Sequence, residues 1–219
     1  MSLSTITDNL DRYAEGFLGT LKLTGIGAGT ALVLGVALAA MRVSPVGSLR
    51  AAGLTYVELF RNFPLPVLVV LMAFGLPKLG PPLQGFSFFT WGVLAIGIYH
   101  AAFVCEALRS GINSVGVGQG EAARSLGLTF RQTMGLIVLP QAFRTVIPPL
   151  GNVLIALTKN TSVVALIDVT DITNMTEFII NDTVDPLTAI VGSAVAYLIL
   201  TLPTGLLLGR LERRQAFAR

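Results

Sequence analysis

The chain has 219 residues, of which 53% are hydrophobic and only 12% are charged, against roughly 45–50% and 25% in an ordinary soluble domain. The formal net charge is +3, and one cysteine and one histidine exclude an intrachain disulfide and a His/Cys metal cluster. Both residues, Cys105 and His100, lie in an apolar segment and are expected to serve in packing. The composition predicts a membrane protein, and no basic patch typical of nucleic-acid binding is visible.

Five apolar segments are each close to the ~20 residues that a spanning helix needs. They cover residues 17–41, 53–76, 88–110, 135–158 and 186–209. The fourth contains Pro140, Pro148 and Pro149, and is expected to face other helices or a wet cavity because freed carbonyls need partners in lipid. Residues 1–219 are therefore predicted to form one all-helical integral membrane domain.

The charges predict the orientation. Arginines concentrate near residues 42–53, 109–134 and 210–219, whereas acidic residues collect at the start of the chain and in residues 160–185. Loops rich in Lys and Arg stay in the cytoplasm, so the N-terminus is predicted outside and the C-terminus inside. Loop 111–134 is then cytoplasmic. The outer loop 160–185 is either folded back on the bundle as short amphipathic helices or an ordinary extracellular loop. The last basic interval holds Arg210, Arg213, Arg214 and Arg219.

Common enzymatic devices are absent from the sequence. A phosphate-binding P-loop needs Gly directly before Lys, yet Lys22, Lys78 and Lys159 follow Leu, Pro and Thr. There is no Gly-x-Ser-x-Gly elbow. The chain is therefore predicted not to be an enzyme and to carry no cofactor, so that any ATP and Mg²⁺ would be bound by another chain.

A short helix is predicted in the cytoplasmic loop. Its residues of interest are Gly120, Glu121, Ala122, Ala123, Leu126 and Gly127. Glu121 is expected in the first turn, where it complements the positive helix end, and Gly127 at a left-handed C-terminal cap. The exposed face, formed by Ala122, Ala123 and Leu126, is small and apolar. From physics alone this helix either docks on another protein or lies on the membrane as an amphipathic connector.

The pattern Glu121-Ala122-Ala123, then Gly127, then Ile137-x-Leu139-Pro140 resembles the EAA loop of binding-protein-dependent ABC importer permeases. The resemblance implies a type I ABC importer permease fold in a bacterial cytoplasmic (inner) membrane. It also implies that residues 120–127 form a coupling helix that docks on an ATPase. The implied partners are two ATP-binding-cassette ATPase subunits, an extracytoplasmic amino-acid-binding protein, and a second permease subunit that is either identical or paralogous.

Further segments are similar to the polar amino-acid uptake branch, and look most like a glutamate-uptake permease subunit. They include Glu58-Leu-Phe-Arg-Asn62, Glu106-Ala-Leu-Arg-Ser-Gly-Ile112 and Lys159-Asn-Thr-Ser162. Within helices, Glu58 and Arg61 are spaced to form an ion pair, as are Glu106 and Arg109. Such pairs are either interfacial or part of a polar pathway lining.

Candidate substrate-binding residues follow from these segments. They are Arg61, Asn62, Asn152, Lys159, Asn160, Thr161 and Ser162. A buried cationic substrate needs an anionic partner, and Lys159 is the only charged residue from Asn152 to Ser162. This favours an acidic or neutral cargo, L-glutamate first, with aspartate and glutamine as alternatives. The rival functions are an ion-coupled secondary amino-acid carrier and a non-transporting membrane scaffold or sensor.

Overall fold

The computed structural model describes residues 4–183 and 185–216, without the side chains of residue 144 and residues 211–216. The side chains of Arg213 and Arg214, and the whole of Arg219, therefore lie outside the described part. Every element in the described ranges is helical. In chain order they are α1 (Ser4–Thr7), α2 (Leu10–Val43), α3 (Gly47–Asn62), α4 (Leu65–Val70), η1 (Leu71–Gly75), η2 (Leu76–Leu79), η3 (Leu83–Gly85), α5 (Phe88–Asn113), α6 (Val117–Ser125), α7 (Phe130–Gln132), η4 (Thr133–Val138), α8 (Leu139–Asn160), η5 (Thr161–Ile167), α9 (Ile172–Thr183) and α10 (Pro186–Ala216).

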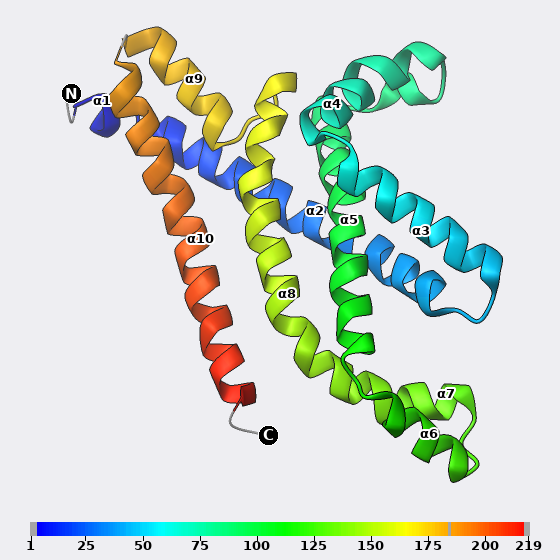
Figure 1. Cartoon of the computed structure of the whole chain (residues 1–219). Coiled ribbons are helices and arrows are strands. Elements are labelled where there is room, and N and C mark those ends of the chain that lie inside the picture. The colour runs from blue at the N-terminus through cyan, green and yellow to red at the C-terminus, as the bar shows by residue number, and fades with distance from the viewer. Residues whose placement is uncertain (1–3, 184, 217–219) are drawn as a thin grey trace.

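Four helical stretches are long and apolar enough to cross a membrane, and a bent pair brings the number to as many as five. The four are Leu10–Val43, Phe88–Asn113, Thr145–Ile167 and Pro186–Arg210. Figure 1 shows α5, α8 and α10 running in broadly similar directions, with α2 crossing them and α3 lying along the second half of α2.

The predicted span 53–76 is not one straight helix. Instead α3 starts at Gly47, ends at Asn62, and is bent by 103° relative to the helical stretch Leu65–Leu79. Phe63 between them has an extended backbone, the conformation favoured before a proline because the proline ring disfavours the helical region. Pro64 therefore determines where α3 stops, and α4 begins directly after it.

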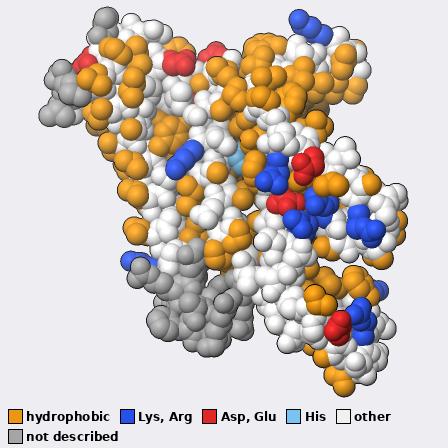
Figure 2. All heavy atoms as spheres, in the orientation of Figure 1, with side chains coloured by type: hydrophobic (Ala, Val, Ile, Leu, Met, Phe, Trp, Pro, Cys, Tyr) orange, Lys and Arg blue, Asp and Glu red, His pale blue; other side chains and the backbone are white. Residues whose placement is uncertain are grey.

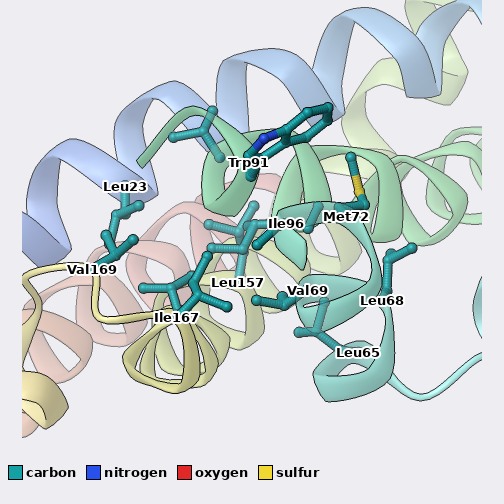
Figure 3. Close-up of a cluster of buried hydrophobic side chains, with 14 of the residues drawn as sticks. Leu23, Leu65, Leu68, Val69, Met72, Trp91, Ile96, Leu157, Ile167 and Val169 are labelled. Atoms are coloured by element: carbon teal, nitrogen blue, oxygen red, sulfur yellow. The ribbon is translucent and has the colours of Figure 1, made fainter. Parts of the chain in front are cut away.

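The main hydrophobic core lies where α2, α4, α5, α8 and η5 meet (Figure 3). Leu23, Ile96 and Leu157 are almost completely buried and come from three different helices. Gly27 lets α2 approach α5 closely, because a Cβ atom at that position would lie 3.1 Å from a methyl carbon of Ile96. The core therefore joins the first membrane helix to the α5–α8 pair.

Residues 160–185 are not an extended loop but contain η5 and α9, which fold back on the bundle. The backbone N–H of Ile172 donates to the Thr20 hydroxyl over 3.2 Å. Gly16 on α2 allows this contact, since a Cβ atom there would lie 2.8 Å from the carbonyl oxygen of Asp171. In Figure 1, α9 lies at the end of the molecule opposite to α6 and α7.

Candidate functional site

The α6 helix ends in a glycine cap. The N–H of Leu128 donates to the Ala123 carbonyl over 3.1 Å, and the N–H of Gly127 donates to the Arg124 carbonyl over 2.9 Å. Gly127 has a φ of +77°. These features make a Schellman cap, in which a residue in the left-handed region satisfies the last carbonyl groups of the helix. Gly127 therefore has the conformation that the sequence predicted.

Two details of the predicted α6 helix were wrong. The helix begins at Val117, so Glu121 is its fifth residue and lies outside the first turn, which contains no acidic side chain. Ala123 is only 3% exposed, because α6 packs on η4 through this side. The outward face instead presents Ala122 and Leu126, the latter 81% exposed, while Gly120 is half-buried.

The segment around α6 is connected firmly to the membrane helices. Thr129 caps α7 in a capping box with Gln132, whose side chain accepts from the Thr129 N–H over 2.9 Å. From Phe130 the helix continues through η4 into α8. On the other side, the hydroxyls of Ser114 and Thr145 lie 3.0 Å apart and link the end of α5 to α8. A displacement of α6 would therefore be transmitted to both α5 and α8.

The second group of candidate residues is centred on a buried contact between α5 and α8. The Nδ2 atom of Asn160 lies 3.1 Å from Nε2 of His100, and the His100 Nδ1 atom lies 2.8 Å from the carbonyl oxygen of Ile96. A carbonyl can only accept, so Nδ1 carries the proton and the Asn160 amide donates to Nε2. His100 is 2% exposed. The prediction of a mere packing role was therefore incomplete, because the ring orients Asn160.

Arg61 is connected to the His100–Asn160 contact by way of the Phe103 ring. Its guanidinium carbon is 5.9 Å from the centre of the Phe103 ring, a cation–π distance. The Phe103 ring centre is in turn 6.1 Å from that of His100. The expected Glu58–Arg61 ion pair does not form between these described residues. The helix ends one residue after Arg61, and the guanidinium turns toward α5.

The other candidate substrate residues are not part of the His100–Asn160 contact. The Asn62 amide donates to the Glu58 carbonyl over 2.7 Å and so closes the end of its own helix. Thr161 is completely buried and its hydroxyl donates to the Thr158 carbonyl over 2.9 Å, so this side chain is not available to a ligand. The tight turn where α8 becomes η5 directs it inward. Asn152 and Lys159 are exposed, and Ser162 is half-buried.

Glu106 forms both the predicted pair and an unpredicted one. It accepts from Arg109 over 2.8 Å and from Arg42 of α2 over 3.0 Å. The sequence indicated the first partner through its three-residue spacing, whereas the second is far away in the chain. Figure 2 shows Lys and Arg side chains gathered with acidic ones over the region of α3 and the adjoining part of α5.

Comparisons with known proteins identify the family of the chain. The model of the family described as "Binding-protein-dependent transport system inner membrane component" matches residues 31–217. The chain belongs to this family. It is accordingly a multi-pass protein of the inner membrane and a transport subunit, and the family assignment gives no support to the ion-coupled carrier.

Similar curated proteins cover nearly the whole chain. A probable glutamine ABC transporter permease of Bacillus subtilis is 40% identical, with 98% of each chain covered. A glutamate transport system permease of Corynebacterium glutamicum is 44% identical, with 91% of this chain and 92% of that protein covered. A solved structure described as an amino acid ABC transporter with histidines matches with a TM-score of 0.91 and 32% identity, covering 98% and 99% of the two chains. The type I ABC importer permease fold is thus established.

Proposed function

We propose that this chain is the permease subunit of an ATP-driven importer that carries polar amino acids, and L-glutamate in particular, into the cell. The observation that carries this proposal is the connection of Arg61 to the His100–Asn160 contact through Phe103. It puts a cation and an oriented amide on one face of the bundle. A cation and amide donors are the groups that bind carboxylates.

The cargo is inferred from this chemistry together with the names of the relatives. Relatives that cover more than nine tenths of this chain are named for glutamine, for glutamate, and for glutamate and aspartate. An arginine transport permease of Bacillus subtilis is 36% identical and covers 72% of this chain. Lys159 is the only charged residue between Asn152 and Ser162, and it adds positive charge to this part of α8. The names of the relatives with the highest coverage and this positive charge favour an acidic or neutral cargo over a basic one.

The α6 helix is the proposed contact with the ATPase. Its exposed Leu126 and Ala122 would enter a groove on an ATP-binding-cassette subunit, with Glu121 beside them at the surface. ATP-driven closure of two such subunits would move α6, and the continuous η4–α8 helix would carry the movement to Asn160. The substrate pathway beside Asn160 would then open first to one side of the membrane and then to the other, which is alternating access.

The complete importer would contain two ATPase subunits, an extracytoplasmic binding protein and a second permease chain. ATP hydrolysis is assigned to the ATPase subunits and not to this chain, whose lysines do not form a P-loop. Purification of the chain from its native membrane should therefore yield an ATPase chain with it.

The cargo is tested by Asn160→Asp in the purified importer reconstituted in vesicles with its binding protein. A carboxylate cannot donate to His100 and would repel an acidic substrate, and like charges placed together cost several kcal/mol. We expect uptake of radiolabelled L-glutamate to fall at least about tenfold, the equivalent of ~1.4 kcal/mol. The ATPase should still copurify with the variant.

Asn181→Asp is the matched control, because it makes the same change at an exposed position on α9. Its glutamate uptake should equal that of the wild type. Unchanged uptake by Asn160→Asp would remove this face from the substrate pathway. If wild-type uptake of radiolabelled arginine exceeds that of glutamate, the acidic cargo is wrong.

A further inference from the structure

A cavity lined by arginines lies away from the His100–Asn160 contact, at the ends of α2 and α5. It has a volume of about 660 Å³ and is lined by three arginines from three helices: Arg42, Arg50 and Arg109. Apolar residues complete the lining, among them Leu54 and Met134. Cavities of this size are in the range of ligand pockets, and none of the candidate substrate residues lines this one.

The cavity carries an excess of positive charge. The carboxylate of Glu106 bonds to both Arg42 and Arg109 and so neutralises one of the three guanidinium groups. Arg50 donates through one nitrogen to the carbonyl oxygens of Ser44 and Pro45, over 2.9 and 3.0 Å. Carbonyl groups orient this guanidinium without neutralising it. Arg50 is exposed, and it is the arginine of the three that has no carboxylate partner among the described residues.

The position of the cavity indicates where such an anion comes from. Arg42 is next to the last residue of α2, and Arg109 is in the last two turns of α5, so both lie at the ends of membrane-spanning helices. The exposed Leu54 provides an apolar wall beside the arginines. Basic pockets between membrane helices at this level bind the headgroups of anionic lipids, and positively charged side chains donate charge-assisted hydrogen bonds to phosphate oxygens.

We propose that the pocket lined by Arg42, Arg50 and Arg109 binds the phosphate of an anionic membrane lipid. The phosphate would lie between the guanidinium groups, with an acyl chain along Leu54. Bound in this way, the lipid would join the α2–α3 turn to the end of α5. This site contains none of the candidate substrate residues, and Phe130 and Met134 of the α7–η4 segment also line it.

The test uses the intact importer in nanodiscs of equal parts phosphatidylglycerol and phosphatidylcholine, with retained lipids identified by native mass spectrometry. Wild-type protein should retain phosphatidylglycerol in preference to phosphatidylcholine. Arg50→Gln should lower that retention about fivefold, the effect of one basic group near an anionic surface, whereas Arg50→Lys should keep most of it. Arg210→Gln is the matched control, because it removes an exposed arginine from α10, and retention should be unchanged.

Each other outcome overturns the proposal. Equal retention by wild type and Arg50→Gln would mean that the pocket holds no lipid phosphate. Equal losses in the Gln and Lys variants would assign Arg50 to its carbonyl contacts in the α2–α3 turn rather than to the ligand. Binding of inorganic phosphate in phosphatidylcholine nanodiscs, without any preference for phosphatidylglycerol, would replace the lipid by a soluble anion. None of these readouts depends on transport of glutamate.

Discussion

The segment between α5 and α8 and the segment between α8 and α10 both connect membrane helices, yet they are built in opposite ways. Around α6 the large apolar side chains point outward, with Leu126 81% exposed and Val117 76% exposed. Around α9, Ile172 and Ile179 are completely buried against the bundle, although Phe178 is 47% exposed. The first connection leaves its large apolar side chains open, whereas the second buries two of its isoleucines within the same chain.

This difference indicates which contacts the chain makes by itself and which it leaves to a partner. An apolar patch that is open on a subunit marks an interaction surface, whereas a buried one contributes to the stability of the subunit itself. Damage to the α9 region should therefore lower the stability of this chain. Damage to α6 should leave the chain folded and affect the proposed contact with the ATPase.

The largest effect is expected from Gly16→Ala, at the contact of α2 with the α9 region. Its Cβ atom would lie 2.8 Å from the carbonyl oxygen of Asp171 and 2.9 Å from the Cα atom of Ile172. Both are backbone atoms, so the outer segment must shift, and overpacking of this kind costs about 1–3 kcal/mol. Thermal unfolding of the purified chain in detergent should show the loss. Gly25→Ala on the same helix meets no atom within 4 Å and should not lower the melting temperature; equal effects would contradict the close contact.

A smaller and more local effect is expected from Gly127→Ala. Only the backbone conformation distinguishes Gly127 from Gly120, because a Cβ atom at either position meets no atom within 4 Å, and Gly127 alone of the two has a positive φ, +77°. A side chain in the left-handed region costs about 1–2 kcal/mol, which corresponds to roughly 5–30-fold in the population of the capped helix. Transport-coupled ATP hydrolysis should therefore fall, while the melting temperature of the chain stays the same.

Gly120→Ala provides the comparison for that variant. Gly120 lies inside α6, where alanine favours the helix, so its coupled ATP hydrolysis should be at least that of the wild type. If both variants lose hydrolysis equally, the cap is not the cause, and the surface of α6 tolerates no added methyl group at all.

The smallest effect concerns pH. Burial of the Asp171 carboxyl raises its pKa above the ordinary value of 3.8, against the opposing hydrogen bonds from the Asn174 N–H and the Tyr197 hydroxyl. The folded chain then holds this proton at a pH where the unfolded chain has lost it. This contribution to stability is complete below 3.8 and decreases as the pH rises through the raised pKa.

The Asp171→Asn variant removes this proton, and it should therefore remove the pH dependence. The stability of the wild type relative to Asp171→Asn should decrease as the pH rises above 3.8, measured by thermal unfolding in detergent. Asp11→Asn changes an exposed carboxylate of α2 in the same way. The plots of melting temperature against pH should differ in slope more between the wild type and Asp171→Asn than between the wild type and Asp11→Asn. Parallel plots for the wild type and Asp171→Asn would show that Asp171 does not titrate in this pH range.

Local features of the fold could be predicted because local chemistry determines them. Helices α5 and α10 begin at Phe88 and Pro186, the residues at which apolar segments begin. Gly127 was assigned to the helix cap because few other residues adopt a positive φ. The bend after Asn62 was missed although Pro64 and Pro66 signalled it, since hydropathy alone does not distinguish a straight helix from a bent one.

Contacts between distant residues could not be predicted. His100 is 60 positions from Asn160, and no spacing rule connects them, although a histidine inside an apolar span is itself a signal of a polar role. The burial of Ala123 depends on η4, and the second partner of Glu106 depends on how α2 crosses α5. In each case the missing information was the packing of one helix on another.

The bend after Asn62 has a consequence for where water can enter the membrane. A helix end leaves up to four carbonyl groups without intrahelical partners, and Pro64 has no N–H to offer them. The Asn62 side-chain amide bonds to the carbonyl of Glu58, which precedes the last four residues of α3. In hydrocarbon the last four carbonyl groups need water or another protein group as partners. The carbonyl groups at the end of α3 thus add to the charge of Arg61 in attracting water to this part of the protein.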